Sequence, residues 1–284
     1  MRIALCLAVL LAVVAQASAS AGGARRSGWI LYWREDPWPS IWALAPDASQ
    51  GKRILGNTQN AKRPRLSPDR SWVAFDGAPP GKRVMSDFDI QLVHLDGTGL
   101  HTVTDAAAWD TDAQWSPDGE WLSFTRTPPS PMNCNLASVW IVRVDGTGSR
   151  RVANGCGARW SPDGRRLVYS SRAGPLFVVR VGGGKPRRVR GTRASDAAAG
   201  WSSRGILFSR THDRNGHNAD VFVTNAAGTR VRRLGSGFAA AWSPSGAQIL
   251  YTTSFFSALW VMNADGSRKH RIADVSGAAE PDWR

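Results

Sequence analysis

One short phrase, Trp-Ser-Pro-Asp-Gly, recurs along the chain and constrains its fold more than any other feature. It occupies residues 115–119 and 160–164, and variants of it begin at Leu66, Trp201 and Trp242. Pro fixes φ at the first turn position, Asp hydrogen-bonds the local backbone, and Gly accepts a positive φ. The phrase therefore predicts a strand that ends in a hairpin turn.

Each turn precedes further apolar segments with a period of two. An aliphatic and an aromatic residue alternate after the turn, as in Val73 and Phe75 or Leu122 and Phe124, which is typical of a half-buried strand. A second apolar strand follows, then a turn such as Asp145-Gly146, then a basic fourth strand. One unit of the repeat is thus predicted to be a four-stranded antiparallel meander.

The chain begins and ends within such a unit. Ile30 and Tyr32 match a second strand that has no first strand before it, and residues 280–283 match the start of the phrase at the opposite end. We predict that the C-terminal strand completes the first unit. The fold class expected is all-β, a six-bladed β-propeller of four-stranded antiparallel blades, because the repeat spacing of 41 to 49 residues suits propeller blades. Six inner positions then close the ring: Leu66, Trp115, Trp160, Trp201, Trp242 and Trp283.

The same residues resemble a known family. The Trp-Ser-Pro-Asp-Gly phrase, an Ile-x-Phe strand and the segment Val-Met-Asn-Ala-Asp-Gly-Ser at 261–267 are similar to the TolB-type, WD-repeat-like six-bladed β-propeller. The resemblance covers essentially all of residues 28–284. It implies the propeller fold, in a repeat type that occurs in periplasmic adaptors and peptidase accessory domains.

The N-terminus has the pattern of an export signal. Arg2 precedes an apolar run over residues 3–14 and then small residues, with cleavage sites after Ala19 or Ala21. We expect residues 1–21 to be a signal peptide that is removed and residues 22–284 to form a single domain without a transmembrane segment, secreted or periplasmic.

Two cysteines remain after removal of the signal, Cys134 and Cys156. In an oxidising compartment an even count predicts one disulfide, and closing a loop of this length would stabilise the fold by about 3 kcal/mol. The alternative is two buried free thiols.

The loops after the second strand of several units exceed what a hairpin needs and should share one face of the ring with the loops that enter the inner strands. Such loops are the natural place for binding groups. The predicted partner contacts on this face are Trp38, Trp109, Asp110, Asp112, His212 and His217. Structural alternatives remain: the two Asp residues could stabilise turns, Trp38 could pack against a neighbouring loop, and the His residues could belong to a solvated polar loop. The repeated inner Trp residues are instead interpreted as core between blades.

The formal charge of +14, from 36 Lys and Arg against 22 Asp and Glu, raises the possibility of a polyanionic partner with salt-dependent affinity. Pairs such as Arg150-Arg151 and Arg187-Arg188 fall on predicted outer strands, where charge keeps sheets of different molecules from pairing. Edge protection therefore suffices as an explanation, and no nucleic acid partner is predicted.

Catalytic motifs are not found. The sequence has no Gly-x-Ser-x-Gly elbow, no His-Glu-x-x-His and no phosphate-binding Gly-x-x-x-x-Gly-Lys. We therefore expect an exported, monomeric, non-catalytic propeller that needs no cofactor and binds an envelope or extracellular protein or peptide. The alternative is a propeller-type hydrolase or lyase with a metal in the central channel, because such enzymes assemble sites from scattered residues.

Overall fold

The computed structural model of the chain describes residues 28–35, 39–56, 60–78, 88–129, 134–172, 174–213, 218–253, 258–274 and 278–284. The expected signal peptide, Trp38 and His217 lie outside these ranges. Within them, no helix has the length and apolarity needed to cross a membrane.

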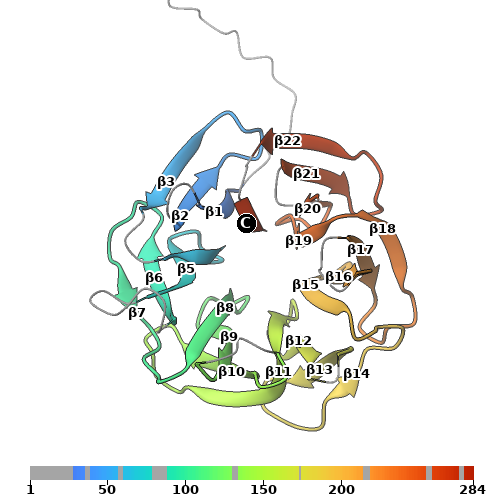
Figure 1. Cartoon of the computed structure of the whole chain (residues 1–284), viewed down its shortest axis with the longest axis horizontal. Helices are drawn as coiled ribbons and strands as arrows, with labels where there is room; N and C mark the ends of the chain where they lie inside the picture. Colours follow the sequence, from blue (N-terminus) through green and yellow to red (C-terminus); the bar gives the residue numbers. More distant parts are fainter. Residues whose placement is uncertain are drawn as a thin grey trace, which may run out of the picture.

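Antiparallel sheets stand side by side in a ring around a central opening (Figure 1). The first sheet contains β23 (Ala278–Trp283), β1 (Ile30–Glu35), β2 (Pro39–Leu44) and β3 (Gly51–Leu55). The second contains β4 (Lys62–Leu66), β5 (Trp72–Gly77), β6 (Asp89–His94) and β7 (His101–Thr102). The all-β, propeller-like arrangement of four-stranded sheets is confirmed.

The ring continues through three more sheets. One has seven strands, β8 (Trp109–Trp115), β9 (Trp121–Thr127), β10 (Ser138–Arg143), β11 (Arg150–Trp160), β12 (Arg166–Ser171), β13 (Leu176–Arg180) and β14 (Arg187–Arg188). The next has β15 (Asp196–Ser202), β16 (Gly205–Thr211), β17 (Ala219–Thr224) and β18 (Arg232–Ser236). The last has β19 (Phe238–Trp242), β20 (Gln248–Thr252), β21 (Ala258–Asn263) and β22 (His270–Asp274).

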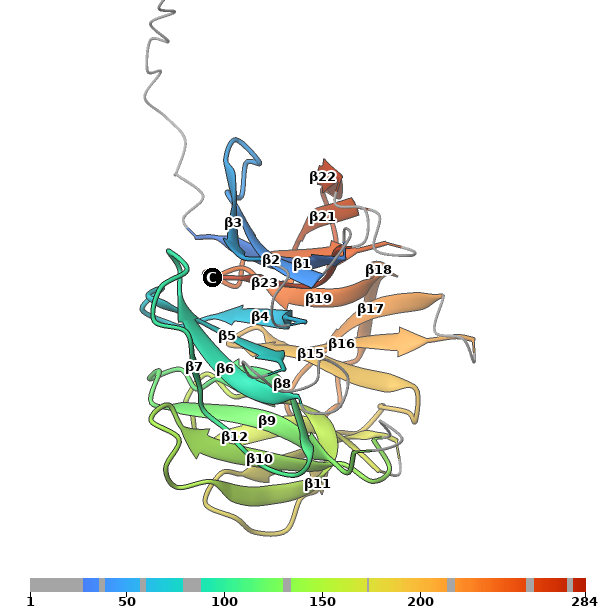
Figure 2. The same cartoon turned by 60° about the vertical axis from the view of Figure 1, so that its left-hand side comes forward.

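The two ends of the described chain close the ring. β23 pairs with β1 in antiparallel register, with Ile30 opposite Trp283. Trp29 and Arg284 exchange two backbone hydrogen bonds, of 2.6 and 3.1 Å. Figure 2 shows β23 alongside β1, and β23 also contacts β4 and β19 of the flanking sheets. The predicted completion of the first unit by the C-terminal strand is confirmed.

The seven-stranded sheet arises because the first half of β11 pairs with one strand and its second half pairs with another. Residues 150–154 pair with β10, and residues 155–160 pair with β12. A buried cluster that includes Val139 and Ile141 from one half and Leu167 and Tyr169 from the other packs between the two halves. The two halves of the sheet thus face each other across this cluster, and the sheet bends at β11.

The repeated phrase forms the predicted turn. In the copies that begin at Leu66, Trp115 and Trp160 the Ser hydroxyl accepts the backbone N–H five residues on, as Ser161 does from Arg166 at 2.9 Å. The same hydroxyl donates to the Asp carboxylate two residues on. Gly119 and Gly164 adopt φ values of 77° and 66°, which only Gly tolerates without strain. This explains why Ser, Pro, Asp and Gly recur together.

The core lies between successive sheets. Phe75, Phe124 and Phe208 are fully buried, and their size makes them large contributors to the hydrophobic stabilisation. The indole of Trp115 donates to the Arg65 carbonyl of the preceding sheet at 3.0 Å, and Trp160 donates to Gln114 in the same way. The interpretation of the repeated Trp residues as core is confirmed for these two, since Trp115 packs between two sheets and Trp160 packs between the two halves of the seven-stranded sheet.

The outer strands are exposed, as expected. β3, β7, β14, β18 and β22 stand at the outer ends of their sheets. Arg187 and Arg232 are exposed there, and His101 and His270 also lie on outer strands. β11 differs because only its first half occupies an outer position.

Candidate binding site in the central channel

The innermost strands all carry an irregularity just before the repeated Leu or Trp. Their pairing with the next strand shifts register, as between Lys62 and Arg65 in β4 and between Thr111 and Gln114 in β8. The residue three positions before the repeated Leu or Trp takes a positive φ at Arg63 (50°), Asp112 (55°), Gly157 (66°), Ala239 (43°) and Glu280 (49°). A bulge redirects its side chain, and left-handed backbone costs a non-Gly residue about 1–2 kcal/mol. The bulges form part of the channel wall.

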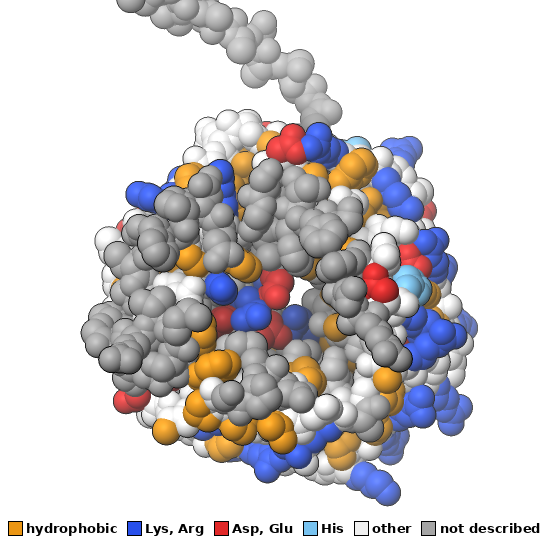
Figure 3. Space-filling view, viewed as in Figure 1, with side chains coloured by type: hydrophobic (Ala, Val, Ile, Leu, Met, Phe, Trp, Pro, Cys, Tyr) orange, Lys and Arg blue, Asp and Glu red, His pale blue; other side chains and the backbone are white. Residues whose placement is uncertain are grey.

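Charged side chains converge on one side of this wall, from the innermost strands β23, β4, β8 and β11 and from Asp76 on β5 behind them. The Arg63 guanidinium lies 2.8 Å from Asp76 and 2.9 Å from Glu280. Asp112 lies between two other guanidiniums, 2.8 Å from Arg159 and 3.6 Å from Arg65. Figure 3 shows acidic and basic side chains together within the central hollow.

The network extends into the backbone. Arg65 donates from Nη1 to the Glu280 carbonyl at 2.9 Å, and the Asp112 N–H donates to Asp76 at 3.2 Å. Arg159 donates from Nε to the Ala199 carbonyl at 3.1 Å. The ionic cluster therefore links five successive inner strands across the channel.

Burial and neighbouring charge shift the acids of this cluster in opposite directions. Burial raises the pKa of Asp76 to about 6, against the attraction of Arg63, and Glu280 and Asp112 add repulsion. Burial also acts to raise the pKa of Asp112, but Arg159 and Arg65 together hold it below the ordinary value. Asp112 is thus the firmly ionised member, and Asp76 is the one that titrates near neutral pH.

The opposite side of the channel is lined by small, apolar side chains. β15 contributes Ala197, Ala198 and Ala199, and β19 contributes Ala239, Ala240 and Ala241. Between this alanine wall and the ionic cluster lies a cavity of about 450 Å³ on the face that also carries the disulfide. This volume lies within the usual range for ligand pockets, roughly 300–1,000 Å³.

A second cavity, of about 460 Å³, opens at the other end of the channel. The Trp-Ser-Pro turns line it, including Pro117, Pro162 and Pro244. The two cavities share five lining residues, Gln114, Arg159, Ala199, Ala241 and Asp282. These residues form the neck between the two mouths of the channel.

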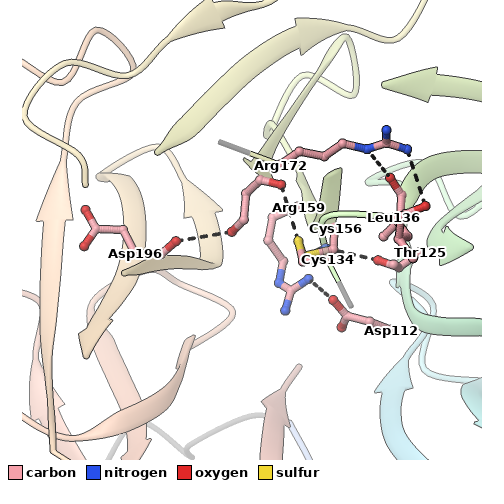
Figure 4. Close-up of a disulfide and its surroundings, with 11 residues drawn as sticks. Asp112, Thr125, Cys134, Leu136, Cys156, Arg159, Arg172 and Asp196 are labelled. Atoms are coloured by element: carbon pink, nitrogen blue, oxygen red, sulfur yellow. Dashed lines mark hydrogen bonds and ion pairs between the residues drawn. A yellow bond between two sulfur atoms is a disulfide. The ribbon is translucent and has the colours of Figure 1, made fainter. Parts of the chain in front are cut away.

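The predicted disulfide between Cys134 and Cys156 is present, with a Cα–Cα distance of 5.5 Å. Both cysteines line the first cavity, and Figure 4 shows the disulfide beside the Asp112–Arg159 ion pair. It fastens the connection between β9 and β10 to β11, where Thr125 accepts the Gly157 N–H at 3.1 Å. The bond therefore holds part of the channel mouth.

The predicted contacts on β8 occupy different environments. Asp112 lines the cavity, as described above. Asp110 is fully buried and accepts two hydrogen bonds from Arg126, at 2.7 and 2.6 Å. Trp109 is half-buried and meets Phe88 edge to face, with ring centroids 5.8 Å apart. Only Asp112 of these three side chains reaches the channel cavity.

His212 lies away from the channel, at the end of β16. Its side chain is 49% exposed, and its Nε2 lies 2.8 Å from Asp220, which also binds Arg233. The structure therefore does not bring His212 together with Asp112. Trp38 and His217 fall outside the described residues, so their roles stay predictions.

Sequence reasoning did not select Arg63, Arg65, Asp76, Arg159 or Glu280. A signal for four of them was available, since Arg63 and Glu280 stand three positions, and Arg65 and Arg159 one position, before the repeated Leu or Trp. Those two positions carry charge in some units and Ala or Gly in others, such as Ala239. Variation at an otherwise regular repeat position marks the channel lining.

The described channel residues do not fit a metal ion. Asp76, Asp112 and Glu280 each lie against an arginine. Among the residues that the structure describes, no group of three or more His, Cys, Asp or Glu side chains is arranged to hold a metal. We therefore assign no chemistry to a metal in the channel.

The fold of this chain occurs in solved structures, although no family model and no curated protein matches its sequence. TolB from Acinetobacter baumannii superimposes with a TM-score of 0.75 at 23% identity, over 92% of this chain and 67% of that chain. A putative TolB from Agrobacterium tumefaciens gives 0.65 at 16% identity, over 89% and 91%. The fold is that of a TolB-type β-propeller.

An enzyme shares this architecture with lower structural similarity and lower sequence identity. An oligogalacturonate lyase in complex with manganese superimposes with a TM-score of 0.56 at 12% identity, covering 83% of this chain and 71% of the lyase. At this identity the similarity concerns fold alone.

Proposed function

We propose that this chain is an exported, non-catalytic β-propeller that binds a segment of a protein or peptide in its central channel, entering from the face that carries the disulfide. The observation that carries the proposal is the two-sided wall of the cavity. Alanines offer room on one side, while the other side presents both guanidiniums and carboxylates. A peptide backbone presents both C=O and N–H groups, so it complements such a wall.

Charge balance favours a peptide over a strongly anionic ligand. Arg63, Arg65 and Arg159 already have Asp76, Asp112 and Glu280 as partners. An anion would have to compete with these internal carboxylates, whereas a neutral polar chain would not. Asp112 is therefore the predicted partner contact with the most direct access, and we propose Trp109 as a contact beside it on the loop face.

We further propose that the mature chain, from residue 22, forms a single domain of six blades. The seven-stranded sheet comprises two four-stranded units that share β11, because β11 pairs with β10 in one unit and with β12 in the other. Six clusters of buried side chains, each between two successive units, support this count within the described ranges. Extracytoplasmic export is supported by the disulfide, since such bonds persist in oxidising compartments.

The experiment is site-specific photo-crosslinking in intact cells that produce the full-length chain. A photoreactive residue at Ala197, which is exposed and lines the cavity, should capture a discrete partner, and placing Trp at neighbouring Ala199 in the same chain should prevent this capture by filling the space. The matched control is Gly182, where an added side chain meets nothing within 4 Å. Capture at Gly182 but not Ala197, or capture unchanged by placing Trp at neighbouring Ala199, would reject the channel as the binding site.

The alternative is a hydrolase or lyase with a metal in the channel. The chain shares its fold with oligogalacturonate lyase, whereas the described channel residues provide no cluster of metal ligands for such an enzyme. This alternative predicts that acidic oligosaccharides are cleaved by the purified protein in a reaction that manganese stimulates and Ala197→Trp blocks. Binding of a peptide partner without any such cleavage favours the scaffold.

A further inference from the structure

Nearly all of the net charge of this chain resides in one quarter of its length. Residues 164–233, which we call the basic sector, contain 15 Lys and Arg against 3 Asp, a net charge of +12 out of +14 for the whole chain. The other 214 residues contain 21 basic and 19 acidic residues and are almost neutral. The positive charge is therefore a property of two neighbouring parts of the ring, from β12 to β18.

Two of the three acidic residues in the basic sector bind arginines of the same sector. Asp196 is buried and binds Arg210 through two hydrogen bonds of 2.7 and 2.8 Å. Asp220 binds Arg233 through two of 2.6 Å each. These two pairs leave most guanidiniums of the sector without an acid. Lys185, Arg187, Arg190 and Arg230 are exposed and form no ion pair within the described part of the chain.

The free basic residues belong to one continuous surface. The Arg190 N–H donates to the Ala227 carbonyl at 3.1 Å, which joins the segment after β14 to the turn before β18. Gly191 packs against Val231 in the same junction. The surface continues toward β22, since Arg232 donates to the carbonyls of Asp265 and Ala264 at 2.6 and 3.2 Å. Figure 3 shows Lys and Arg gathered along the edge of the ring that carries β18 in Figure 1.

Edge protection alone does not explain this concentration. It would call for charge on every outer strand, yet the outer strand β7 consists of His101 and Thr102. β3, β14 and β18 each carry two basic residues, so these three outer strands are similarly charged. The surplus lies in the segments beside β14 and β18, at Lys185, Arg190, Arg193 and Arg230, where charge is not needed to block strand pairing.

We propose that the basic sector binds a linear polyanion, an acidic polymer whose repeating groups are phosphates or carboxylates. Guanidiniums bind both groups through paired hydrogen bonds, and release of counterions from the polymer favours association. The outer strands of the sector, β14 and β18, lie on the convex circumference of the ring (Figure 1), which a flexible chain can track and a flat membrane can touch only locally. Leu136 is the exposed large hydrophobic residue among those described, and it lies outside the sector, so nothing there would insert into a bilayer.

The test measures binding of the full mature chain to inorganic polyphosphate, to polygalacturonate and to vesicles containing phosphatidylglycerol. The first two probes distinguish phosphate from carboxylate. Arg187→Gln, Arg190→Gln and Arg230→Gln together should weaken binding to the preferred polymer by about 10-fold or more at low salt and should reduce the slope of log affinity against log salt by roughly two.

The matched control removes the same charge elsewhere. Arg53→Gln, Arg150→Gln and Arg151→Gln together lower the net charge equally but lie outside the basic sector, and should change the affinity less than 2-fold. Equal losses in the two triple variants, or no salt-dependent binding by the unaltered chain, would overturn the proposal, as would tighter binding to vesicles than to either polymer. Ala197→Trp should leave polymer binding intact, which separates this surface from the channel.

Discussion

Arg63 on β4 and Glu280 on β23 lie 2.9 Å apart, so the strand that ends the chain is joined by an ion pair to a neighbouring sheet. Arg65 adds a hydrogen bond to the Glu280 carbonyl, while β1 pairs with β23 on its other side. The closing strand is therefore held through backbone pairing, through burial of Trp283 and through charge.

Deleting residues 278–284 should destabilise the whole ring. The deletion removes the pairing partner of β1 and the buried Trp283, and loss of one large buried aromatic alone costs about 3–5 kcal/mol. We expect the Tm to fall by about 10 °C or more. Glu280→Gln should cost no more than about 1 kcal/mol, because its carboxylate is partly exposed. Similar thermal melts of the deletion variant and the unaltered chain would contradict strand closure.

Trp115 and Trp283 provide a matched pair for the indole hydrogen bond between sheets. Both are 3% exposed at equivalent repeat positions, but the Trp115 N–H donates to Arg65 and that of Trp283 has no partner among the described residues. Trp115→Phe should therefore cost about 1 kcal/mol more than Trp283→Phe in urea unfolding. Equal losses would show that packing alone accounts for the conserved geometry of these rings.

Asp76 should make stability depend on pH in an unusual direction for a carboxylate. Burial raises its pKa to about 6, whereas an unfolded Asp titrates near 4. The protonated form is thus favoured in the folded state, and stability is lost as pH rises from about 4 to 6. Asp76→Asn removes this titration.

The unfolding free energy of the unaltered chain, measured relative to Asp76→Asn, should fall by about 3 kcal/mol across that window and then remain level. Asp220→Asn serves as the opposite control, since the hydrogen bond from Arg233 lowers the pKa of Asp220 to about 2. Its effect should be full above about pH 4 and vanish as pH falls toward 2. A rise instead of a fall for Asp76 would mean that Arg63 outweighs burial.

Replacing both Cys134 and Cys156 by Ser should lower the unfolding free energy by about 3 kcal/mol, because a cross-link across 22 residues restricts the unfolded chain. Reduction of the unaltered protein should have the same effect. Thiol titration of the denatured, non-reduced mature chain should find no free cysteine. Two reactive thiols would instead support the alternative of free cysteines.

The sequence was sufficient to predict the strands and the closing strand, because both depend on local chemistry repeated in order. The disulfide was predicted on a different basis, the even number of cysteines left after export. Turn residues such as Pro117 and Gly119 report directly on backbone geometry. The merging of two units through β11 was not predictable in this way. There the chain changes its partner strand within β11 and makes no hairpin turn. Gly155 and Gly157 adopt positive φ values of 146° and 66°, but they form an irregularity inside a strand, which the sequence pattern does not distinguish from other glycines.

The channel was less accessible to sequence reasoning for a different reason. Asp110 and Asp112 are two residues apart in β8, yet one is buried against Arg126 and the other reaches the cavity. The bulge between Thr111 and Gln114 causes this difference. Ion pairs such as Asp112 with Arg159 join residues from separate sheets, and only the closed ring brings them together.

The continuity of β11 also limits where the polypeptide can be opened in a circular permutant. Because Trp29 and Arg284 are already adjacent, a short linker could join these two residues and new ends could be opened at an exposed turn such as that around Gly182. Opening the polypeptide between residues 150 and 160 would instead sever the ladders on both sides of the cut. Circular permutants should accordingly fold when broken elsewhere on the rim and fail when broken there.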